Sequence, residues 1–210
     1  MTPAAAPGAQ RTAHTADLTA AELDAVRARL ADAFDGDLAD EDREHALGGL
    51  HVPVHHDAVR LAAHRSVVMR RVRHRDRRLR VGYAEAVAVR AGLRRQGIGG
   101  RVTAEPERIV DRAYDAGMLS ASDEGAALYR ARGRRVRPGR GCALGVDGVV
   151  RLPGEEGSAF VRPAPAGPLD PAYELVFDWR DGDVLCRADG ETAAQRGAMR
   201  SAVSDSRKSE

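Results

Sequence analysis

The sequence lacks long hydrophobic runs and is poor in cysteine, and both absences narrow the class of protein. No apolar run approaches the roughly 20 residues that a membrane helix needs, so we expect no membrane association. Cys142 and Cys186 show neither metal-ligand spacing nor a disulfide framework. Residues 1–10 lack the basic cluster and the bulky apolar run of a secretory signal. Together these features predict a cytoplasmic location.

Aromatic residues make up only 4% of the chain, and Lys208 is the only lysine. Arginines crowd residues 65–101 and 130–140, whereas acidic residues crowd 32–44. The net charge of +2 is therefore the sum of separate positive and negative regions, which suit an anionic cofactor and a cationic substrate bound side by side. Because aromatic side chains are not interleaved with the arginines of residues 65–80, we expect a solvated hairpin there and no nucleic-acid surface.

Three nearby histidines, His51, His55 and His56, raise the question of a metal site. Adjacent residues of a strand point to opposite faces, and no carboxylate-histidine motif accompanies these side chains. We therefore expect no metal.

The chain length of 210 residues fits one globular domain. Residues 1–10 are small and rich in proline, which predicts a disordered arm, and residues 186–210 are polar and small, which predicts a tail. We expect the folded domain over residues 11–185.

Helical patterns occur in four places. Thr19 and Glu22 form a capping box, which predicts a helix of about four turns that Gly36 ends. Residues 40–47 predict a short second helix. A third is expected over residues 98–116, closed by Gly117. A fourth is expected from residue 122 to residue 130, ending at Gly133. Because Pro106 interrupts the third pattern, either that helix bends there or its boundaries differ.

Strand patterns fill the remainder of the domain. Residues 51–56 and 58–71 predict a hairpin with a tight turn near Asp57, and residues 78–90 predict a central strand. Alternation places Tyr83, Glu85, Val87 and Val89 on one face of that strand. Further strands, which complete a mixed sheet, are expected over residues 118–120, 141–144, 158–162 and 173–178.

The strongest chemical signal is Arg94-x-x-Gly97-x-Gly99, placed between the central strand and a helix. Unpaired backbone N–H groups at a helix N-terminus bind anions, and glycines allow close backbone approach. Pyrophosphate therefore fits this loop, although a simple tight turn is the alternative. The sequence has neither a Gly-Lys-Ser/Thr loop for nucleoside triphosphates nor a full GxGxxG for dinucleotides.

This loop resembles the Arg/Gln-x-x-Gly-x-Gly/Ala signature of the GCN5-related N-acetyltransferases, which holds the pyrophosphate of coenzyme A. Other segments are similar to the aminoglycoside 2'-N-acetyltransferases, and they lie at residues 14–18 (HTADL), 33–42, 44–51 (EHALGGLH), 82–91 and 178–184 (DWRDGDV). The resemblance implies an α/β fold of the GCN5-related type, with a central mixed, mostly antiparallel sheet flanked by helices. It also implies acetyl-CoA as co-substrate, an aminoglycoside or related aminosugar as acceptor, antibiotic resistance as the outcome, and a homodimer.

Two residues are candidates for proton transfer. Glu85 is a carboxylate in an apolar strand, where burial should raise its pKa; an ion pair with an arginine is the plainer reading. In the resembled family this glutamate takes the proton of the acceptor amine through water. Tyr129, in ALYRARG, matches the tyrosine that protonates the departing thiolate, or else it is a core residue. Direct attack of the amine on the thioester needs no covalent intermediate.

The resemblance also implies the binding residues. The coenzyme is expected at Val87, Ala88, Val89, Arg94, Arg95, Gln96, Gly97, Ile98, Gly99 and Gly100. The acceptor is expected at Asp37, Glu85, Ala86, Ser120, Gly154, Glu155 and Asp183. The chain departs from the family at Arg134 and Leu185, where aromatic residues are expected, and at Ala86, which replaces a glycine. Two other hypotheses remain: an enzyme of the same fold with another amine as acceptor, and a non-catalytic acyl-CoA-binding module.

Overall fold

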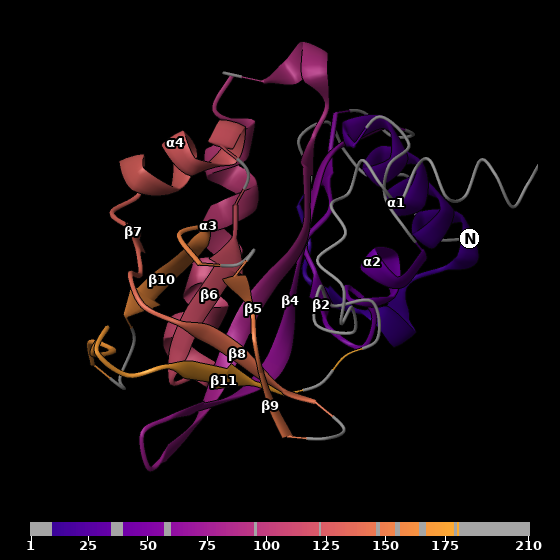
Figure 1. Ribbon diagram of the computed structural model, residues 1–210. Coiled ribbons are helices and arrows are strands. Elements are labelled where there is room, and N and C mark those ends of the chain that lie inside the picture. The colour runs from indigo at the N-terminus through magenta and orange to yellow at the C-terminus, as the bar shows by residue number, and fades with distance from the viewer. Residues whose placement is uncertain are drawn as a thin grey trace, which may run out of the picture.

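The structure is a computed structural model that describes residues 10–34, 40–56, 60–94, 96–121, 123–145, 148–153, 156–163, 167–178 and 180. Its strands form one sheet with helices on both sides (Figure 1). The expected arm over residues 1–10, except Gln10, and the expected tail over residues 186–210 lie outside the described residues.

The chain begins with a short strand β1 (Ala13–His14), a 3-10 turn η1 (Thr15–Asp17) and helix α1 (Ala20–Ala33). The predicted capping box is confirmed, because the Thr19 hydroxyl accepts from the Glu22 backbone N–H and the Glu22 carboxylate accepts from that of Thr19. Helix α2 (Asp40–Glu44) is shorter than expected. Gly36, the expected end of the first helix, lies outside the described residues, and α1 ends at Ala33.

The expected strand over residues 51–56 is two short strands, β2 (Leu50–His51) and β3 (Val54–His55). Both pair antiparallel with β4 (Leu61–His74), so the expected pairing is right, although residues 57–59 are not described. The long hairpin instead joins β4 to β5 (Arg77–Val89) through a turn at Arg75 and Asp76.

The arginines of this hairpin are not uniformly solvated. Arg71 and Arg73 are exposed as expected, but Arg65 and Arg70 are buried in the sheet. The expectation of a solvated hairpin is therefore right for its far end and wrong near the middle of β4.

A β-bulge interrupts the β4-β5 ladder. His64 pairs with Ala88 and Ser66 pairs with Glu85, so two residues of β5 oppose Arg65 alone. Ala86, the first of these two, has a φ of +50°. Because β4 is regular here, Glu85 and Ala88 lie on the same side of the sheet, opposite to their expected alternation.

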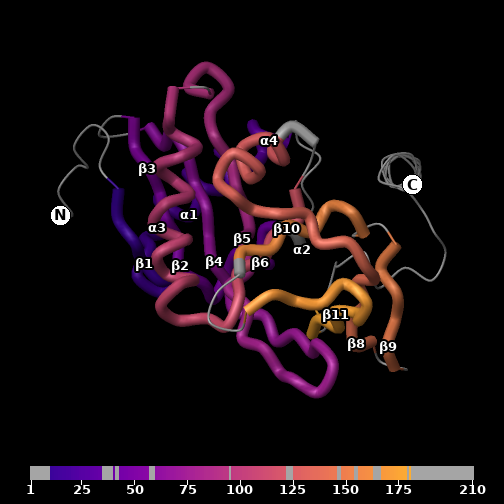
Figure 2. Tube along the Cα trace, turned by 90° about the vertical axis from the view of Figure 1, so that its left-hand side faces the viewer, coloured from indigo at the N-terminus to yellow at the C-terminus, as the bar shows by residue number. Residues whose placement is uncertain are grey.

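Figure 2 views the molecule from the left-hand side of Figure 1, so helix α3 (Ile98–Ala113) lies over the sheet and α1 lies behind it. Ala86 and Ala88 pack against Val26 and Leu30 of α1. Helix α3 covers the opposite side, where Val89 packs against Val102. The prediction that Val87 and Val89 share the face of Glu85 is therefore wrong, since the bulge shifts the alternation by one residue.

Helix α3 continues past Pro106 and ends at Ala113, three residues before the predicted end. The prediction that Gly117 closes the helix is wrong, because this glycine lies inside β6 (Ala116–Ser120). A Cβ at Gly117 would lie 2.7 Å from Val110 Cγ1, so the missing side chain allows α3 to pack closely against β6. Helix α4 (Asp123–Ala131) follows, and Gly133 ends it in the left-handed conformation, as predicted.

Five strands complete the sheet: β7 (Arg135–Val136), β8 (Gly141–Gly145), β9 (Gly148–Arg151), β10 (Ala159–Pro163) and β11 (Leu175–Phe177). Among the described residues the main strand order is β7-β10-β6-β5-β4-β11-β8-β9. The β5-β6 and β8-β11 pairs are parallel and the others are antiparallel. The prediction of a mixed, mostly antiparallel sheet is confirmed.

Candidate active site

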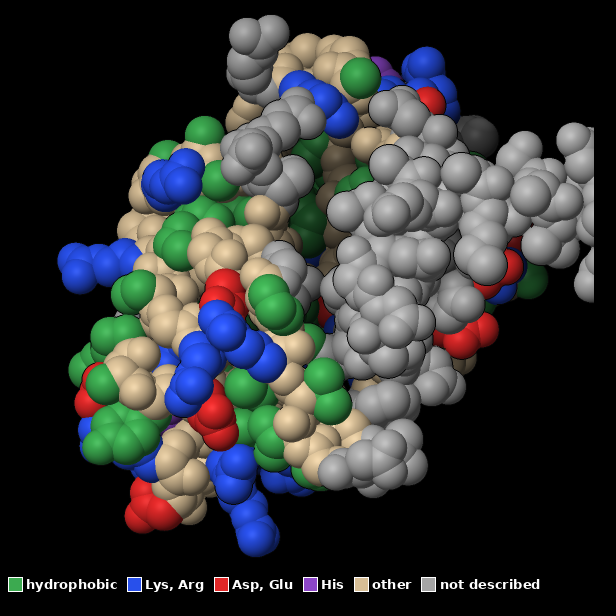
Figure 3. Space-filling view, viewed as in Figure 1, with side chains coloured by type: hydrophobic (Ala, Val, Ile, Leu, Met, Phe, Trp, Pro, Cys, Tyr) green, Lys and Arg blue, Asp and Glu red, His purple; other side chains and the backbone are tan. Residues whose placement is uncertain are grey.

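Strands β5 and β6 separate after a short parallel ladder. They pair at Val81, Gly82 and Tyr83 of β5, after which β6 pairs only with β10 through Leu119 and Ser120. Among the described strands, none pairs with this edge of β5 beyond Tyr83. The backbone from residue 84 to residue 89 therefore offers hydrogen-bonding groups to a ligand on that side. Figure 3, viewed as Figure 1, shows a recess with hydrophobic side chains at its depth between α4 and the upper part of β5.

The open edge leads to the start of α3. Gly97 caps the helix with a φ of +79°, without a side-chain hydrogen bond to the first turn, and that turn carries no acidic residue. The first N–H groups, those of Ile98, Gly99 and Gly100, thus lie at the positive end of the helix dipole. The structure confirms the predicted strand-loop-helix order. Gln96 donates from Nε2 to the Gly92 carbonyl at 3.0 Å, while Arg95 lies outside the described residues.

Helix α4 packs beside this first turn. The position that a Cβ would take on Gly99 lies 3.4 Å from Leu128, and on Gly100 it lies 3.8 Å from Arg132 Nη1. Glycine at both positions leaves the helix start uncovered by its own side chains.

Glu85 lies on the α1 side of the sheet where β5 and β6 separate. It forms an ion pair with Arg180 Nη1 at 2.9 Å. The Tyr83 hydroxyl lies 2.9 Å from Ser120 Oγ, and the guanidinium of Arg180 lies over the Tyr83 ring. The structure thus gathers Tyr83, Glu85 and Ser120, of which Glu85 and Ser120 were predicted.

Burial is the largest influence on the Glu85 carboxyl, and it raises the pKa above the ordinary value. Arg180, His45 and Arg70 lower that pKa, but less than burial raises it. Glu85 thus shows both the raised pKa that was predicted and the ion pair with an arginine that was the alternative. Arg180 was not predicted, although it belongs to the DWRDGDV segment.

Tyr129 lies on the other side of the sheet at the same opening. It is buried against Ala84, Leu119 and Phe160. The guanidinium groups of Arg65 and Arg134 lie 5.6 and 5.7 Å from the centre of its ring. Tyr129 and Glu85 therefore approach the gap between β5 and β6 from opposite faces.

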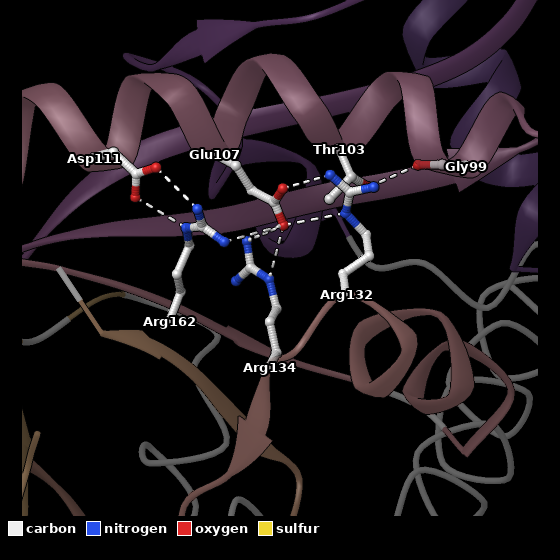
Figure 4. A network of polar contacts seen from close by, with 7 residues as sticks. All are labelled: Gly99, Thr103, Glu107, Asp111, Arg132, Arg134 and Arg162. Atoms are coloured by element: carbon white, nitrogen blue, oxygen red, sulfur yellow. Dashed lines mark hydrogen bonds and ion pairs between the residues drawn. The ribbon is translucent and has the colours of Figure 1, made fainter.

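Arg134 is buried here, and its partner explains how the chain accommodates a charge where an aromatic was expected. It donates from Nη2 to Glu107 Oε1 at 3.3 Å, and Arg132 donates to Glu107 Oε2 at 2.5 Å. Figure 4 shows Arg132, Arg134 and Arg162 converging on Glu107 of α3. Burial raises the pKa of Glu107, but the hydrogen bond from Arg132 and the neighbouring charges outweigh it, so the net shift is downward. This network ties α3 to the end of α4, which carries Tyr129.

Four of the predicted acceptor residues, Asp37, Gly154, Glu155 and Asp183, lie outside the described residues, and so does Leu185. Of the predicted coenzyme residues, Arg94 lies in the loop and donates from Nε to the Val89 carbonyl at 3.4 Å. Sequence reasoning missed Arg65, His51 and His64, all buried around the bulge. His51 was considered only as a metal ligand, whereas its ring contacts Thr15 and His64.

The chain is 44% identical over 178 residues to the aminoglycoside 2'-N-acetyltransferase of Mycolicibacterium fortuitum, across 83% of this chain and 90% of the relative. The chain belongs to the aminoglycoside 2'-N-acetyltransferase family. The enzyme class predicted from the sequence, an acyltransferase, agrees with this membership.

Solved structures confirm that this chain has the GCN5-related fold. The GNAT family N-acetyltransferase YhbS of Escherichia coli, solved in complex with CoA, has a TM-score of 0.58 at 17% identity over 86% of this chain and 94% of its own. ElaA of Escherichia coli has a TM-score of 0.52 at 16% identity over 74% of this chain and 99% of its own. A scan against protein-family models finds no match.

No helix among the described residues is long and apolar enough to cross a membrane. Nor do they contain a group of three or more His, Cys, Asp or Glu side chains placed to hold a metal ion. The absence of a metal in the working protein stays a prediction.

Proposed function

We propose that the protein transfers the acetyl group of acetyl-CoA to the 2'-amino group of aminoglycosides. The observation that carries this proposal is the placement of Glu85 and Tyr129 on opposite sides of the opening between β5 and β6. A base and an acid are thereby available on the two sides of a bound thioester. The relative from Mycolicibacterium fortuitum, named for this reaction, supports the choice of acceptor.

The coenzyme is proposed to lie along the open edge of β5, with its pantetheine arm beside Val87, Ala88 and Val89. Its pyrophosphate would accept hydrogen bonds from the N–H groups at the start of α3, from Ile98 to Gly100. Arg94, Arg95 and Gln96 would add charge and donors at the loop. The CoA complex of YhbS, which shares the fold, is consistent with a coenzyme of this class.

Glu85 is proposed to receive, through water, the proton that the acceptor ammonium must lose before attack. The amine nitrogen then forms a bond to the thioester carbon, and the carbon-sulfur bond breaks with its electron pair on sulfur. Tyr129 gives its hydroxyl proton to the thiolate. The nitrogen then loses its second proton, which passes through water to the Tyr129 phenolate and restores the hydroxyl. The products are the amide, the CoA thiol and the one proton first taken by Glu85, and no covalent enzyme intermediate arises.

The acceptor is proposed to lie on the α1 side of β5. Ser120 and Ala86 would contact it near Glu85, and Asp37, Gly154, Glu155 and Asp183 would supply carboxylates and a carbonyl for its ammonium groups. The Arg180 guanidinium occupies the position on Glu85 that a cationic substrate group would approach. Arg180 must therefore share Glu85 with the incoming amine or be displaced by it.

The test follows thiol release from acetyl-CoA with two kanamycins, one carrying a 2'-amine and the other a 2'-hydroxyl. Turnover of the amine form alone is the expected result. Turnover of both would move the reaction to another amine of the sugar. Coenzyme binding without turnover of any aminosugar would indicate a non-catalytic acyl-CoA-binding module.

Three further properties remain proposals that rest on the family. Acetylation should protect a bacterium that expresses the protein from aminoglycosides with a 2'-amine. The protein should act in the cytoplasm, where acetyl-CoA is made and used. A homodimer is also proposed, and light scattering of the purified protein tests it.

A further inference from the structure

A chain of hydrogen-bonded side chains runs through the sheet to the bulge beside Glu85. The Thr15 hydroxyl lies 2.8 Å from His51 Nε2, and His51 Nδ1 lies 2.9 Å from His64 Nε2. His64 Nδ1 lies 3.0 Å from the carbonyl oxygen of Ala86. The chain thus passes from η1 through β2 and β4 to β5. His51 and His64 are 1% and 0% exposed, so water does not compete for these contacts.

The last acceptor determines where every proton of the chain lies. A carbonyl oxygen only accepts, so His64 Nδ1 carries the proton and donates it to Ala86. A neutral His64 then accepts at Nε2, which requires His51 Nδ1 to donate. His51 Nε2 is left as an acceptor, and the Thr15 hydroxyl donates to it. Burial keeps both rings neutral by lowering the pKa of His51 to about 4 and that of His64 to about 3.

A second side chain holds the preceding carbonyl of the same bulge. The buried Ser66 hydroxyl donates to the Glu85 carbonyl oxygen at 3.2 Å. A bulge disrupts the ladder locally, so carbonyls there need other donors. His64 and Ser66, on the same face of β4, supply them to Ala86 and Glu85 in succession. They also hold Ala86 at its φ of +50°, a left-handed conformation in which the Cβ comes too close to the following carbonyl oxygen.

We propose that Thr15, His51 and His64, together with Ser66, are positioning residues that fix the bulge and thereby aim the Glu85 carboxylate and the open edge of β5. This inference rests on the proposed function for its catalytic consequence. The row of hydrogen bonds does not conduct protons, because it ends at a carbonyl oxygen, which has no proton to pass on. Its effect on the reaction is geometric.

The row of hydrogen bonds from Thr15 to Ala86 also gives a role to two sequence segments that the coenzyme site leaves unexplained. Thr15 lies in HTADL and His51 ends EHALGGLH, and neither segment contains a predicted site residue. Thr15 is held in turn by Gly49, whose carbonyl accepts from the Thr15 backbone N–H at 3.1 Å. The N-terminal turn and the loop before β2 thus hold Thr15 and His51 in place, and through them His64 and its contact with β5.

The test compares two substitutions of His64 with a matched control. His64→Leu keeps bulk but removes the donor to Ala86, whereas His64→Asn retains an amide N–H near the position of Nδ1. His74→Leu and His74→Asn are the controls, because His74 is a buried histidine on the same face of β4 whose Nδ1 lies 3.4 Å from the Glu174 carbonyl. Each protein is assayed for acetyl-CoA affinity by calorimetry, for kcat/KM against pH, and for thermal unfolding.

His64→Leu is expected to weaken acetyl-CoA binding and to lower kcat/KM at least about tenfold, since small misplacements of reacting groups are costly. His64→Asn should recover most of both losses, and the His74 variants should change neither. The pH profile of His64→Leu should also shift, because Glu85 would move relative to Arg180, Arg70 and His45, the groups whose interactions lower its pKa. If His64→Leu does not fold, Ser66→Ala replaces it in the test. Ser66→Ala is expected to lower kcat/KM as well, but by less than His64→Leu.

Equal losses in the His64 and His74 variants would overturn the inference, since they would reflect destabilisation alone. So would a crystal structure of His64→Leu or Ser66→Ala with Ala86 still at positive φ and Glu85 unmoved. The two proposals fail separately. Wild-type protein that binds acetyl-CoA but acetylates no aminosugar contradicts the proposed function, while coenzyme affinity and the Ala86 backbone still test the bulge.

Discussion

Glu85 is subject to two opposed influences that together set its chemistry. Burial in the sheet favours the neutral acid, while the guanidinium of Arg180 at 2.9 Å favours the carboxylate. A base whose pKa lies above its ordinary value accepts a proton more readily, provided that it is ionised at the working pH. The pKa of Glu85 should therefore appear in the pH dependence of catalysis.

Glu85→Gln removes the base and retains the shape of the side chain. We expect kcat/KM near neutral pH to fall by about 10²–10⁴, the usual contribution of general base catalysis. The loss should shrink at high pH, where free amine is plentiful. Glu105→Gln, at a half-buried glutamate of α3 that pairs with Arg108, is the control, and initial rates of thiol release from pH 6 to pH 9 are the measurement. An unchanged rate in Glu85→Gln would remove Glu85 from the mechanism.

Arg180→Met tests the ion pair itself. Arg180 lowers the pKa of Glu85, so its removal leaves burial less opposed and that pKa should rise. The limb of the kcat/KM profile on which activity increases with pH should then move to higher pH. A profile that stays in place, with only KM for the aminoglycoside altered, would assign Arg180 to substrate contact instead.

The contact of strands β5 and β6 with α3 depends on glycine at two paired positions, one in each strand. A Cβ at Gly82 would meet Val110 at 2.8 Å and Tyr114 at 2.9 Å, and a Cβ at Gly117 would meet Val110 at 2.7 Å. The sequence alone did not reveal this, because Gly117 after a helical stripe is also typical of a helix end. The packing partner, not the local pattern, determines its role.

Gly117→Ala is expected to lower the free energy of unfolding by about 1–3 kcal/mol, the usual cost of overpacking. Gly92→Ala is a suitable control, since a Cβ there meets nothing within 4 Å and the backbone is not in the left-handed region. Urea denaturation followed by circular dichroism measures both variants. Similar stability of Gly117→Ala and wild type would mean that α3 moves away from β6 without cost.

Much of the architecture was predictable from local patterns. The capping box at Thr19, the central strand and the glycine loop before α3 all appear where their residues indicated. Two-residue strands such as β1 and β7 are too short to leave a period, so they were missed. The bulge at Ala86 was missed too, because its φ is imposed by His64 and Ser66, which are distant in sequence.

In the candidate site, too, local segments predicted some residues, whereas contacts between distant parts of the chain were missed. Glu85, Tyr129 and Ser120 were identified from sequence segments, and the structure places them around the β5-β6 opening. Their neighbours Arg65, His64 and Arg180 come from other parts of the chain, so only the fold brings them together. Buried arginines are unusual, and no local pattern distinguishes Arg65 from the exposed arginines that follow it on β4.

The neutral histidines of the sheet link the stability of the whole molecule to pH. Burial lowers the pKa of His51 to about 4, with His14 nearby adding to the shift, and that of His64 to about 3, from 6.5. Between pH 6.5 and pH 4 the unfolded chain therefore binds more protons than the folded chain, so acid destabilises the fold. Once pH falls below the folded pKa values, these groups contribute no further change.

His51 and His64 should each cost up to about 1.4 kcal/mol of unfolding free energy per pH unit within that window. Urea denaturation at pH 7, 6 and 5 measures the slope above the range where carboxylates titrate. His64→Asn should flatten this slope relative to wild type. Parallel slopes for wild type and His64→Asn would show that His64 is not held neutral in the folded state.

The hairpin of β4 and β5 has a consequence for the order of folding. Its two strands are neighbours in the chain, so their pairing closes a short loop, whereas the parallel β5-β6 pair must wait for the crossover through α3. The proposed coenzyme edge is complete only when β6 has docked. If acetyl-CoA binds at this edge as proposed, it binds that final state alone. It should then slow unfolding without accelerating refolding, and the protein should survive heating longest in its presence.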